Sequence, residues 1–175
     1  MHISQTSDQL SSSPKAFPNC CLAISSSFIS TIASILPKKP SFTASIGSGS
    51  GFLEALITHR HPNVYVEGVE VNDSVNRYIS EDRMNVVAGT WDLHPRVSKA
   101  KAWLFVYPRE PKLIMKYIDT YGGHGVEMII WLGPQADWPE YELHFCQSSF
   151  SNLNFPEESG LAPYEIMAIA RRKPC

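Results

Sequence analysis

The sequence predicts an α/β fold of three layers, in which helices cover both faces of a mainly parallel, seven-stranded sheet. First, strand-like and helix-like segments alternate from Ser41 onward, as they do in chains that build parallel sheets. Second, a glycine-rich loop joins the first of these strands directly to a helix. Third, the chain closes with two strand-like runs that have no helix of useful length between them, which predicts an antiparallel C-terminal hairpin at the sheet edge.

Residues 1–40 are expected to form an N-terminal arm and a helix, followed by a single α/β domain at residues 41–175. The arm, residues 1–18, is rich in Ser, Gln and Pro, which predicts a loose segment. The uncharged run 19–36 has the length of a short membrane span, but its many hydroxyl groups dilute the apolar character. Its apolar positions recur at helical spacing, so the run predicts an amphipathic helix that ends at Pro37.

From residue 41 onward, β-branched and apolar runs predict strands, and periodic apolar positions with end signals predict helices. The expected strands span 41–47, 63–71, 84–90, 101–107, 126–133, 141–149 and 164–173. The expected helices span 52–60, 72–79 and 111–123. Asn72 is a good N-cap for the second helix, and Pro111 stands near the start of the third. The glycines around His124 predict a turn.

Charge and cysteine content argue against two classes of site. The formal net charge is −2 and the pI is near 6.3, so the chain lacks the surplus of Lys and Arg that non-specific nucleic-acid binding requires. The four cysteines show no spacing typical of zinc sites, so no metal is expected. Cys20, Cys21, Cys146 and Cys175 are interpreted as free thiols in a reducing, cytoplasmic compartment, with no membrane partner.

The loop after the first expected strand is the first candidate binding site. Gly47, Gly49 and Gly51 let the backbone turn tightly and approach a ligand, and the helix behind them offers free N–H groups at its positive end. In a parallel sheet, ligands bind at this carboxyl end of the strands. A dinucleotide fingerprint needs glycine at the position of Phe52, which argues against a nicotinamide oxidoreductase. The spacing suits a ligand without a pyrophosphate, such as S-adenosylmethionine.

An acidic residue near the end of the second expected strand is the second candidate. Such an acid can accept hydrogen bonds from both ribose hydroxyls of a nucleoside. Glu67 and Glu70 both lie at a suitable distance beyond the glycines. In a regular strand Glu67 would point to the opposite side, whereas a bulge would turn both to the same side. Glu70 is favoured because it is nearer the strand end.

The run "ASIGSGSGFLEAL", followed by "VEGVEVN" and "VVAGTWDL", resembles the class I S-adenosylmethionine-dependent methyltransferases, which have a Rossmann-like fold. The resemblance covers most of residues 41–173. It implies S-adenosylmethionine as cofactor and S-adenosylhomocysteine as product. It also implies that the three glycines contact the methionine part and that Glu70 holds the ribose.

Further cofactor contacts follow from the same resemblance. The loop after the third strand usually lies along the adenine, which implies contacts from Thr90, Trp91 and Asp92. Trp91 could stack on the base or pack in the core, and Asp92 could contact the adenine or cap a turn. The family often has an acid near Thr90, and another acid two residues before the first glycine that touches the methionine amine. Ser45 stands at the second of these positions.

The loop after the fourth strand usually carries the catalytic position in this family, and here it reads "FVYPREP". Methyl transfer is a displacement on an activated sulfonium, so the protein mainly aligns the reacting groups. Tyr107 and Arg109 could orient a polar or anionic acceptor. His94 could act as a base or lie exposed in a loop, and Glu110 could be a base or begin the next helix. The Asn/Asp-Pro-Pro-aromatic motif of base and glutamine methyltransferases is absent.

The sequence therefore predicts a transferase, an S-adenosylmethionine-dependent methyltransferase that acts on a small molecule rather than on nucleic acid. Two alternatives stay open. One is a methyltransferase-like enzyme for cyclisation, elimination or aminobutyl transfer, which Ser45 and the "YPREP" loop motivate. The other is a non-catalytic partner subunit, which the small size of the chain motivates. Association as a homodimer or with a partner subunit is also open.

Overall fold

The computed structural model describes residues 2–123 and 125–174 of the chain. The turn predicted at His124 and the free thiol predicted at Cys175 lie outside the described residues. The other three cysteines, Cys20, Cys21 and Cys146, are free thiols, as predicted.

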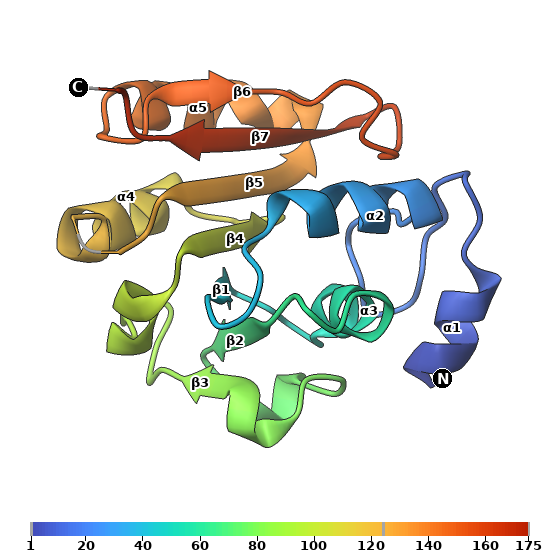
Figure 1. Cartoon of the computed structure of the whole chain (residues 1–175). Helices are drawn as coiled ribbons and strands as arrows, with labels where there is room; N and C mark the ends of the chain where they lie inside the picture. Colours follow the sequence, from blue (N-terminus) through green and yellow to red (C-terminus); the bar gives the residue numbers. More distant parts are fainter. Residues whose placement is uncertain (1, 124, 175) are drawn as a thin grey trace.

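A seven-stranded sheet has the strand order β3-β2-β1-β4-β5-β7-β6, which can be followed from bottom to top in Figure 1. The strands are β1 Thr43–Ile46, β2 Val66–Glu70, β3 Met84–Val86, β4 Ala102–Val106, β5 Met128–Pro134, β6 Asn152–Asn154 and β7 Glu165–Arg171. β1 to β5 pair in parallel, and β7 is antiparallel to both β5 and β6. The mainly parallel sheet with an antiparallel C-terminal hairpin is therefore confirmed. Strand order reverses between β1 and β4, and the carboxyl ends of these strands form the crevice where such sheets bind ligands.

Helices cover both faces of the sheet, which confirms the three layers. The helices are α1 Ile3–Gln9, α2 Ser26–Ile35, α3 Phe52–Arg60, α4 Pro111–Tyr121 and α5 Trp138–Cys146. Short 3-10 helices occupy Asp73–Val75, Glu81–Arg83, Pro95–Lys99 and Gln135–Asp137. α2 and α3 bury Phe28 and Leu56 in one core cluster, and α4 and α5 bury Tyr117 and Phe145 in the cluster on the other face.

The short strand β1 serves both clusters because successive side chains of a strand point to opposite faces. Ala44 and Ile46 belong to the cluster beneath α4 and α5. Ser45 points to the other face, where it contacts α3. This alternation places the one polar side chain at the end of β1 directly under the first turn of α3.

Residues 141–149, predicted as a strand, form most of α5 and the turn after it, so that prediction is wrong. Tyr141, Leu143 and Phe145 alternate with polar residues, which is the strand pattern that misled the prediction. In the structure Trp138, Tyr141 and Phe145 are buried on one helix face, and Leu143 is 60% exposed. The strand that pairs with β7 is β6, which begins only after this helix.

The N-terminal segment is better ordered than the predicted loose arm. α1 packs against α3, where the guanidinium of Arg60 donates to the backbone oxygen of Ser7 at 3.1 Å. Lys15 and Ile24 exchange backbone hydrogen bonds of 3.0 and 2.9 Å, which close a hairpin over residues 15–24, here called the N-terminal hairpin. The helix predicted over 19–36 begins only after this hairpin. Among the described residues, no helix combines the length and apolar character needed to cross a bilayer.

Candidate functional site

The glycine loop, residues 47–51, leads from β1 directly into α3. Gly47, Gly49 and Gly51 have φ angles of 78°, 58° and 77°, a region that side chains disfavour. Gly51 is the N-cap of α3, so the N–H groups of the first helical turn point toward the loop. The backbone N–H groups of Ser50 and Leu53 have no acceptor within residues 2–123 and 125–174. The loop therefore presents free donors at the crevice.

Glu70 lies at the last position of β2 and contacts the glycine loop. Its Oε2 accepts a hydrogen bond from the N–H of Gly49 at 2.9 Å, and its Oε1 accepts one from the N–H of Val71 at 2.9 Å. The side chain is half-buried, so the carboxylate also reaches solvent at the crevice. Two candidates from separate parts of the sequence are thus brought together at the carboxyl ends of β1 and β2.

Glu67 has a structural role on the opposite face of β2, which is regular and has no bulge. The residue is 4% exposed, and its carboxylate binds Arg96 through two nitrogens, with Nε–Oε1 and Nη2–Oε2 distances of 3.1 and 2.7 Å. Hydrogen bonding to Glu67 raises the pKa of the Arg96 guanidinium, which also lies 4.4 Å from the ring centroid of Phe42. Glu67 therefore faces away from the glycine loop.

Ser45 does not stand alone beneath the loop, because a carboxylate from α3 lies against it. The buried Ser45 hydroxyl donates to Oε1 of Glu54 at 2.5 Å. Glu54 is only 3% exposed, and burial raises the pKa of its carboxyl from 4.5 to about 6, against the opposing effect of the Ser45 hydrogen bond. No Lys, Arg or His of the described chain forms an ion pair with it. A buried carboxylate thus occupies the space beside position 45.

Thr90, Trp91 and Asp92 lie in an exposed turn after β3. The N–H of Asp92 donates to the carbonyl oxygen of Gly89 at 3.0 Å, so this residue closes a turn. Trp91 is 45% exposed and is not a core residue, and its carbonyl oxygen accepts a hydrogen bond from Lys116 of α4. Within the part of the chain that the structure describes, none of the three hydrogen-bonds to the glycine loop or to Glu70.

Tyr107 follows β4 and has a φ angle of 49°, a strained value for a residue with a side chain. Its hydroxyl donates to Oε2 of Glu165 at 2.5 Å, and Oε1 of Glu165 accepts the N–H of Ala23 at 3.2 Å. Burial raises the pKa of both groups, and for the Tyr107 phenol the hydrogen bond to Glu165 adds to that effect. The pair joins β4, β7 and the N-terminal hairpin at the crevice.

The remaining catalytic candidates are less engaged with the crevice. Arg109 and Glu110 are exposed, and Glu110 is the N-cap of α4 without a side-chain capping bond. His94 caps a 3-10 turn, where its Nδ1 accepts the N–H of Arg96 at 3.1 Å. That bond occupies one imidazole nitrogen. Within the described residues, His94 forms no hydrogen bond or ion pair with Tyr107 or with the glycine loop.

The N-terminal hairpin covers the glycine loop, which sequence reasoning missed. The Ser50 hydroxyl donates to the carbonyl oxygen of Asn19 at 2.7 Å. Beneath this contact is a cavity of about 100 Å³, here called the loop cavity. It is lined by Asn19, Cys20, Cys21, residues 47–50, Phe52, Leu53, Glu54 and Val106. Cys20 is half-buried, and burial raises the pKa of its thiol to about 12, while Cys21 is exposed.

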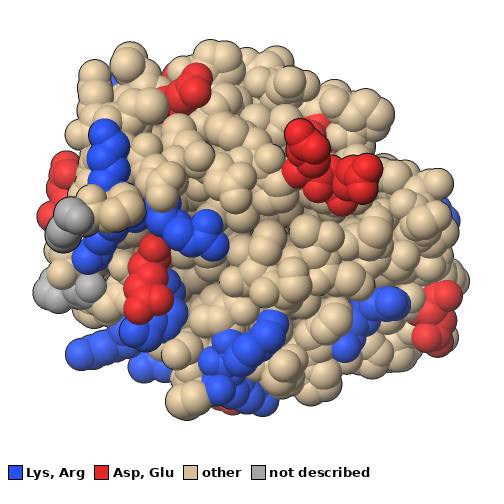
Figure 2. Space-filling model, turned by 45° about the horizontal axis from the view of Figure 1, so that its top comes forward, with Lys and Arg blue, Asp and Glu red and all other residues tan. Residues whose placement is uncertain are grey.

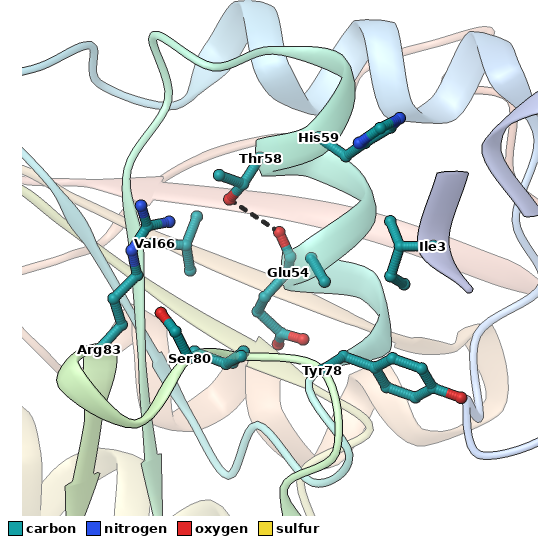
Figure 3. Close-up of a pocket in the computed structure, with 10 residues that line it drawn as sticks. Ile3, Glu54, Thr58, His59, Val66, Tyr78, Ser80 and Arg83 are labelled. Carbon is teal, nitrogen blue, oxygen red and sulfur yellow. Dashed lines mark hydrogen bonds between the residues drawn. The ribbon is translucent and has the colours of Figure 1, made fainter. Parts of the chain in front are cut away.

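A larger hollow of about 320 Å³ lies between α1, α3 and the segment before β3 (Figure 3). Its lining includes Ile3, Glu54, Thr58, His59, Tyr78 and Arg83. In Figure 3 the side chain of Glu54 extends from the first turn of α3 toward the segment that carries Tyr78 and Ser80. Glu54 is a lining residue of both this hollow and the loop cavity.

Basic side chains gather at the other edge of the sheet. Lys101 precedes β4, and Arg171 ends the antiparallel β7, so both lie at the amino ends of the parallel strands. They line a hollow together with Glu127, which pairs with Lys101 at 3.1 Å. In Figure 2 the Lys and Arg side chains lie mainly along the left and lower margins of the face, whose centre carries few charges.

Comparison with known proteins identifies the fold. No protein-family model matches the chain, and no curated protein matches it in sequence. The methyltransferase domain of bacterial CtHen1 is similar, with 12% identity, a TM-score of 0.60 and coverage of 83% of this chain and 97% of that chain. Human N-acetylserotonin methyltransferase, solved in complex with SAM, has 12% identity and a TM-score of 0.55, and covers 85% and 51%. The 23S rRNA methyltransferase ErmE has 14% identity and a TM-score of 0.52, and covers 86% and 69%.

These similarities show that the chain has the class I methyltransferase fold, as the sequence predicts. The names of the similar proteins place acceptors as different as N-acetylserotonin and 23S rRNA on this one fold. The fold therefore does not select an acceptor; the residues of the site do.

Proposed function

We propose that this chain binds S-adenosylmethionine at the crevice and is a methyltransferase for a small-molecule acceptor. The observation that supports this most directly is the contact of the Glu70 carboxylate with the N–H of Gly49 at 2.9 Å. An acid at the end of the second strand, touching the glycine loop after the first, is the arrangement needed to hold a ribose beside that loop. The class I methyltransferase fold supports the same cofactor.

In this proposal each part of the site has its own task. The glycine loop and the first turn of α3 bind the methionine end, and Glu70 accepts hydrogen bonds from the ribose hydroxyls. Thr90, Trp91 and Asp92 form the exposed turn that would border the adenine. Bound S-adenosylmethionine supplies an electrophilic methyl group on sulfur, so the chain needs chiefly to align an acceptor.

Tyr107 and Arg109 are proposed to orient that acceptor. Tyr107 lies after β4 with a strained backbone, and its phenol is fixed by Glu165. Because burial and this hydrogen bond raise the pKa of the phenol, Tyr107 stays protonated near neutral pH and does not act as a base. Its one O–H donates to Glu165, so the phenol oxygen is left to accept a hydrogen bond from the acceptor. Arg109 is exposed beside it and can pair with an anionic group.

A small acceptor fits the charge distribution better than a nucleic acid. The carboxyl edge of the sheet carries the carboxylates of Glu54, Glu70 and Glu165, which oppose a phosphodiester backbone. The basic residues Lys101 and Arg171 lie at the amino edge instead. Polyanion binding needs a basic surface at the site itself.

Calorimetry with S-adenosylhomocysteine tests the cofactor. We expect binding to the wild-type chain, and a lower affinity for Glu70→Gln in the same titration. Absence of heat and of a thermal shift at millimolar ligand would refute the proposed cofactor. Transfer of a labelled methyl group to a panel of small acceptors and to RNA then tests the reaction and its acceptor class.

A second candidate is a non-catalytic subunit with the same fold. The specific observation is that the N-terminal hairpin covers the glycine loop, through the bond from Ser50 to Asn19, where the loop cavity measures about 100 Å³. A chain that binds the cofactor yet transfers no label, alone or with any acceptor, supports this candidate. Turnover by the isolated monomer excludes it.

A further inference from the structure

The loop cavity contains a buried negative group and free positive donors at the same time. Glu54, Ser50 and Leu53 all line it. The N–H groups of Ser50 and Leu53 have no acceptor among the described residues, and they lie at the positive end of α3. A volume of about 100 Å³ holds roughly three water molecules at liquid density. The cavity is therefore large enough for a short charged group and too small for a nucleoside.

Glu54 lacks a cationic partner in the described chain. Ser45 gives it one hydrogen bond, to Oε1, and no ion pair reaches the carboxylate from residues 2–123 and 125–174. A carboxylate that is 97% buried without a counter-charge is unfavourable, because desolvation is not offset by a Coulombic partner. Such a site is suited to a ligand that brings a cation with it.

We infer that Glu54 binds the ammonium group of an α-amino acid zwitterion, while the N–H groups of Ser50 and Leu53 bind its carboxylate. The two charges of the ligand then match the two kinds of group in the cavity. Ser45 is a positioning residue, since its hydroxyl fixes the Glu54 carboxylate. Where the zwitterion is the methionine end of S-adenosylmethionine, the inference rests on the proposed function. A free amino acid is the other source of the same chemistry.

Three ligands separate these sources. S-adenosylhomocysteine has both the nucleoside and the zwitterion, 5′-methylthioadenosine has the nucleoside without the zwitterion, and L-methionine has the zwitterion without the nucleoside. Calorimetry at pH 7.5 measures each with the wild-type chain, with Glu54→Gln and with Glu70→Gln. Glu54→Gln keeps the side-chain volume and an oxygen that accepts from Ser45, and its fold is checked by thermal unfolding.

Glu54→Gln is expected to weaken S-adenosylhomocysteine at least about tenfold, the loss typical of one charge-assisted hydrogen bond. The same variant should leave 5′-methylthioadenosine within about twofold of wild type, because that ligand has no ammonium. Glu70→Gln should weaken both. Equal losses for the two ligands in Glu54→Gln, or no loss in either, overturn the inference. If L-methionine is the one ligand of the three that binds, and Glu54→Gln weakens its binding, the zwitterion site is upheld and the proposed cofactor is refuted. If none of the three ligands binds, both the zwitterion site and the proposed cofactor are refuted.

A second measurement needs no variant. The groups that face Glu54 are Glu70 from β2 and Cys20 from the N-terminal hairpin, with His59, Tyr78 and Arg83 across the neighbouring hollow. Because the pKa of Glu54 is about 6, ammonium binding should strengthen as this group ionises. Wild-type affinity for S-adenosylhomocysteine should rise about tenfold from pH 5 to pH 7, relative to that for 5′-methylthioadenosine. Since Glu70 serves both ligands, the ratio isolates Glu54, and a ratio independent of pH contradicts the inference.

Discussion

The Oε2 atom of Glu70 lies 2.9 Å from the backbone nitrogen of Gly49, which joins the end of β2 to the glycine loop after β1. Glu67, three residues earlier on the same regular strand, points to the other face and binds Arg96. The two acids therefore serve different purposes although their sequence contexts are alike. One reaches the crevice, and the other fixes the loop that precedes β4.

Glu70→Gln and Glu67→Gln should consequently affect different properties. Glu70→Gln should lower ligand affinity, and Glu67→Gln should lower stability. Glu70→Gln should reduce affinity for S-adenosylhomocysteine by about ten- to a hundredfold, because a charged acceptor of the ribose hydroxyls is lost. Its free energy of unfolding should change by less than about 1 kcal/mol, since the amide oxygen still accepts a backbone N–H. Glu67→Gln should lower the free energy of unfolding by about 1–3 kcal/mol through loss of the charged bonds to Arg96. Calorimetry and urea unfolding of both variants check this, and a loss of binding in Glu67→Gln with full stability would contradict it.

Gly51→Ala should destabilise the fold more than Gly49→Ala. Both glycines have positive φ, so each substitution forces a side chain into a disfavoured backbone region at about 1–2 kcal/mol. Only at Gly51 does the added Cβ also meet buried atoms, with Ile79 Cγ1 at 2.5 Å, whereas nothing lies within 4 Å at Gly49. Overpacking of this kind adds about 1–3 kcal/mol. Urea unfolding of the two variants measures the difference in unfolding free energy. Equal losses of stability would show that Ile79 moves away from the added Cβ at little energetic cost.

Cys21 should report on occupation of the loop cavity. It is an exposed thiol that lines the cavity. Cys146, at the end of α5, is an exposed thiol that is not part of the cavity lining and serves as the control. Limited alkylation with iodoacetamide at pH 8 should modify both, and saturating S-adenosylhomocysteine should slow Cys21 while leaving Cys146 unchanged. Cys20 should react slowly in either case, because burial raises the pKa of its thiol to about 12. Peptide fragmentation in the mass spectrometer assigns each site; equal protection of Cys146 would indicate a global effect.

The fold and half of the candidate site follow from local sequence signals. Gly51 before a helix and Glu70 at a strand end are set by short-range geometry, and their spacing along the chain predicts that they meet. The prediction of a strand over 141–149 was wrong because a short aromatic run fits both strand alternation and helical periodicity. Burial of Trp138 on one helix face favours the helix.

The other half of the site depends on contacts between distant segments. Glu165 contacts Tyr107 and Ala23 only in the folded arrangement of β7, β4 and the N-terminal hairpin. No local sequence pattern predicts these contacts. Glu54 did leave a signal, because it is the one charged residue in the apolar run "FLEALI". An acid on the buried face of a helix that follows a glycine loop indicates a functional group, since burial of a charge is otherwise unfavourable.

The unfolding free energy should carry the same signature of Glu54, independently of any ligand. Its carboxyl has a pKa of about 6 in the folded chain and an ordinary value of 4.5. Between these values the folded state holds a proton that the unfolded state has released, so stability falls as pH rises, by about 2 kcal/mol in total.

Glu54→Gln removes this loss. The variant should match wild type at pH 4 and exceed it by up to about 2 kcal/mol at pH 7, although it binds S-adenosylhomocysteine more weakly. Urea unfolding at both pH values tests this. The carboxyl of Glu165, whose pKa is also raised, is common to both proteins and cancels in the difference. Parallel stability curves for the two proteins would show that Glu54 titrates alike in the folded and unfolded states.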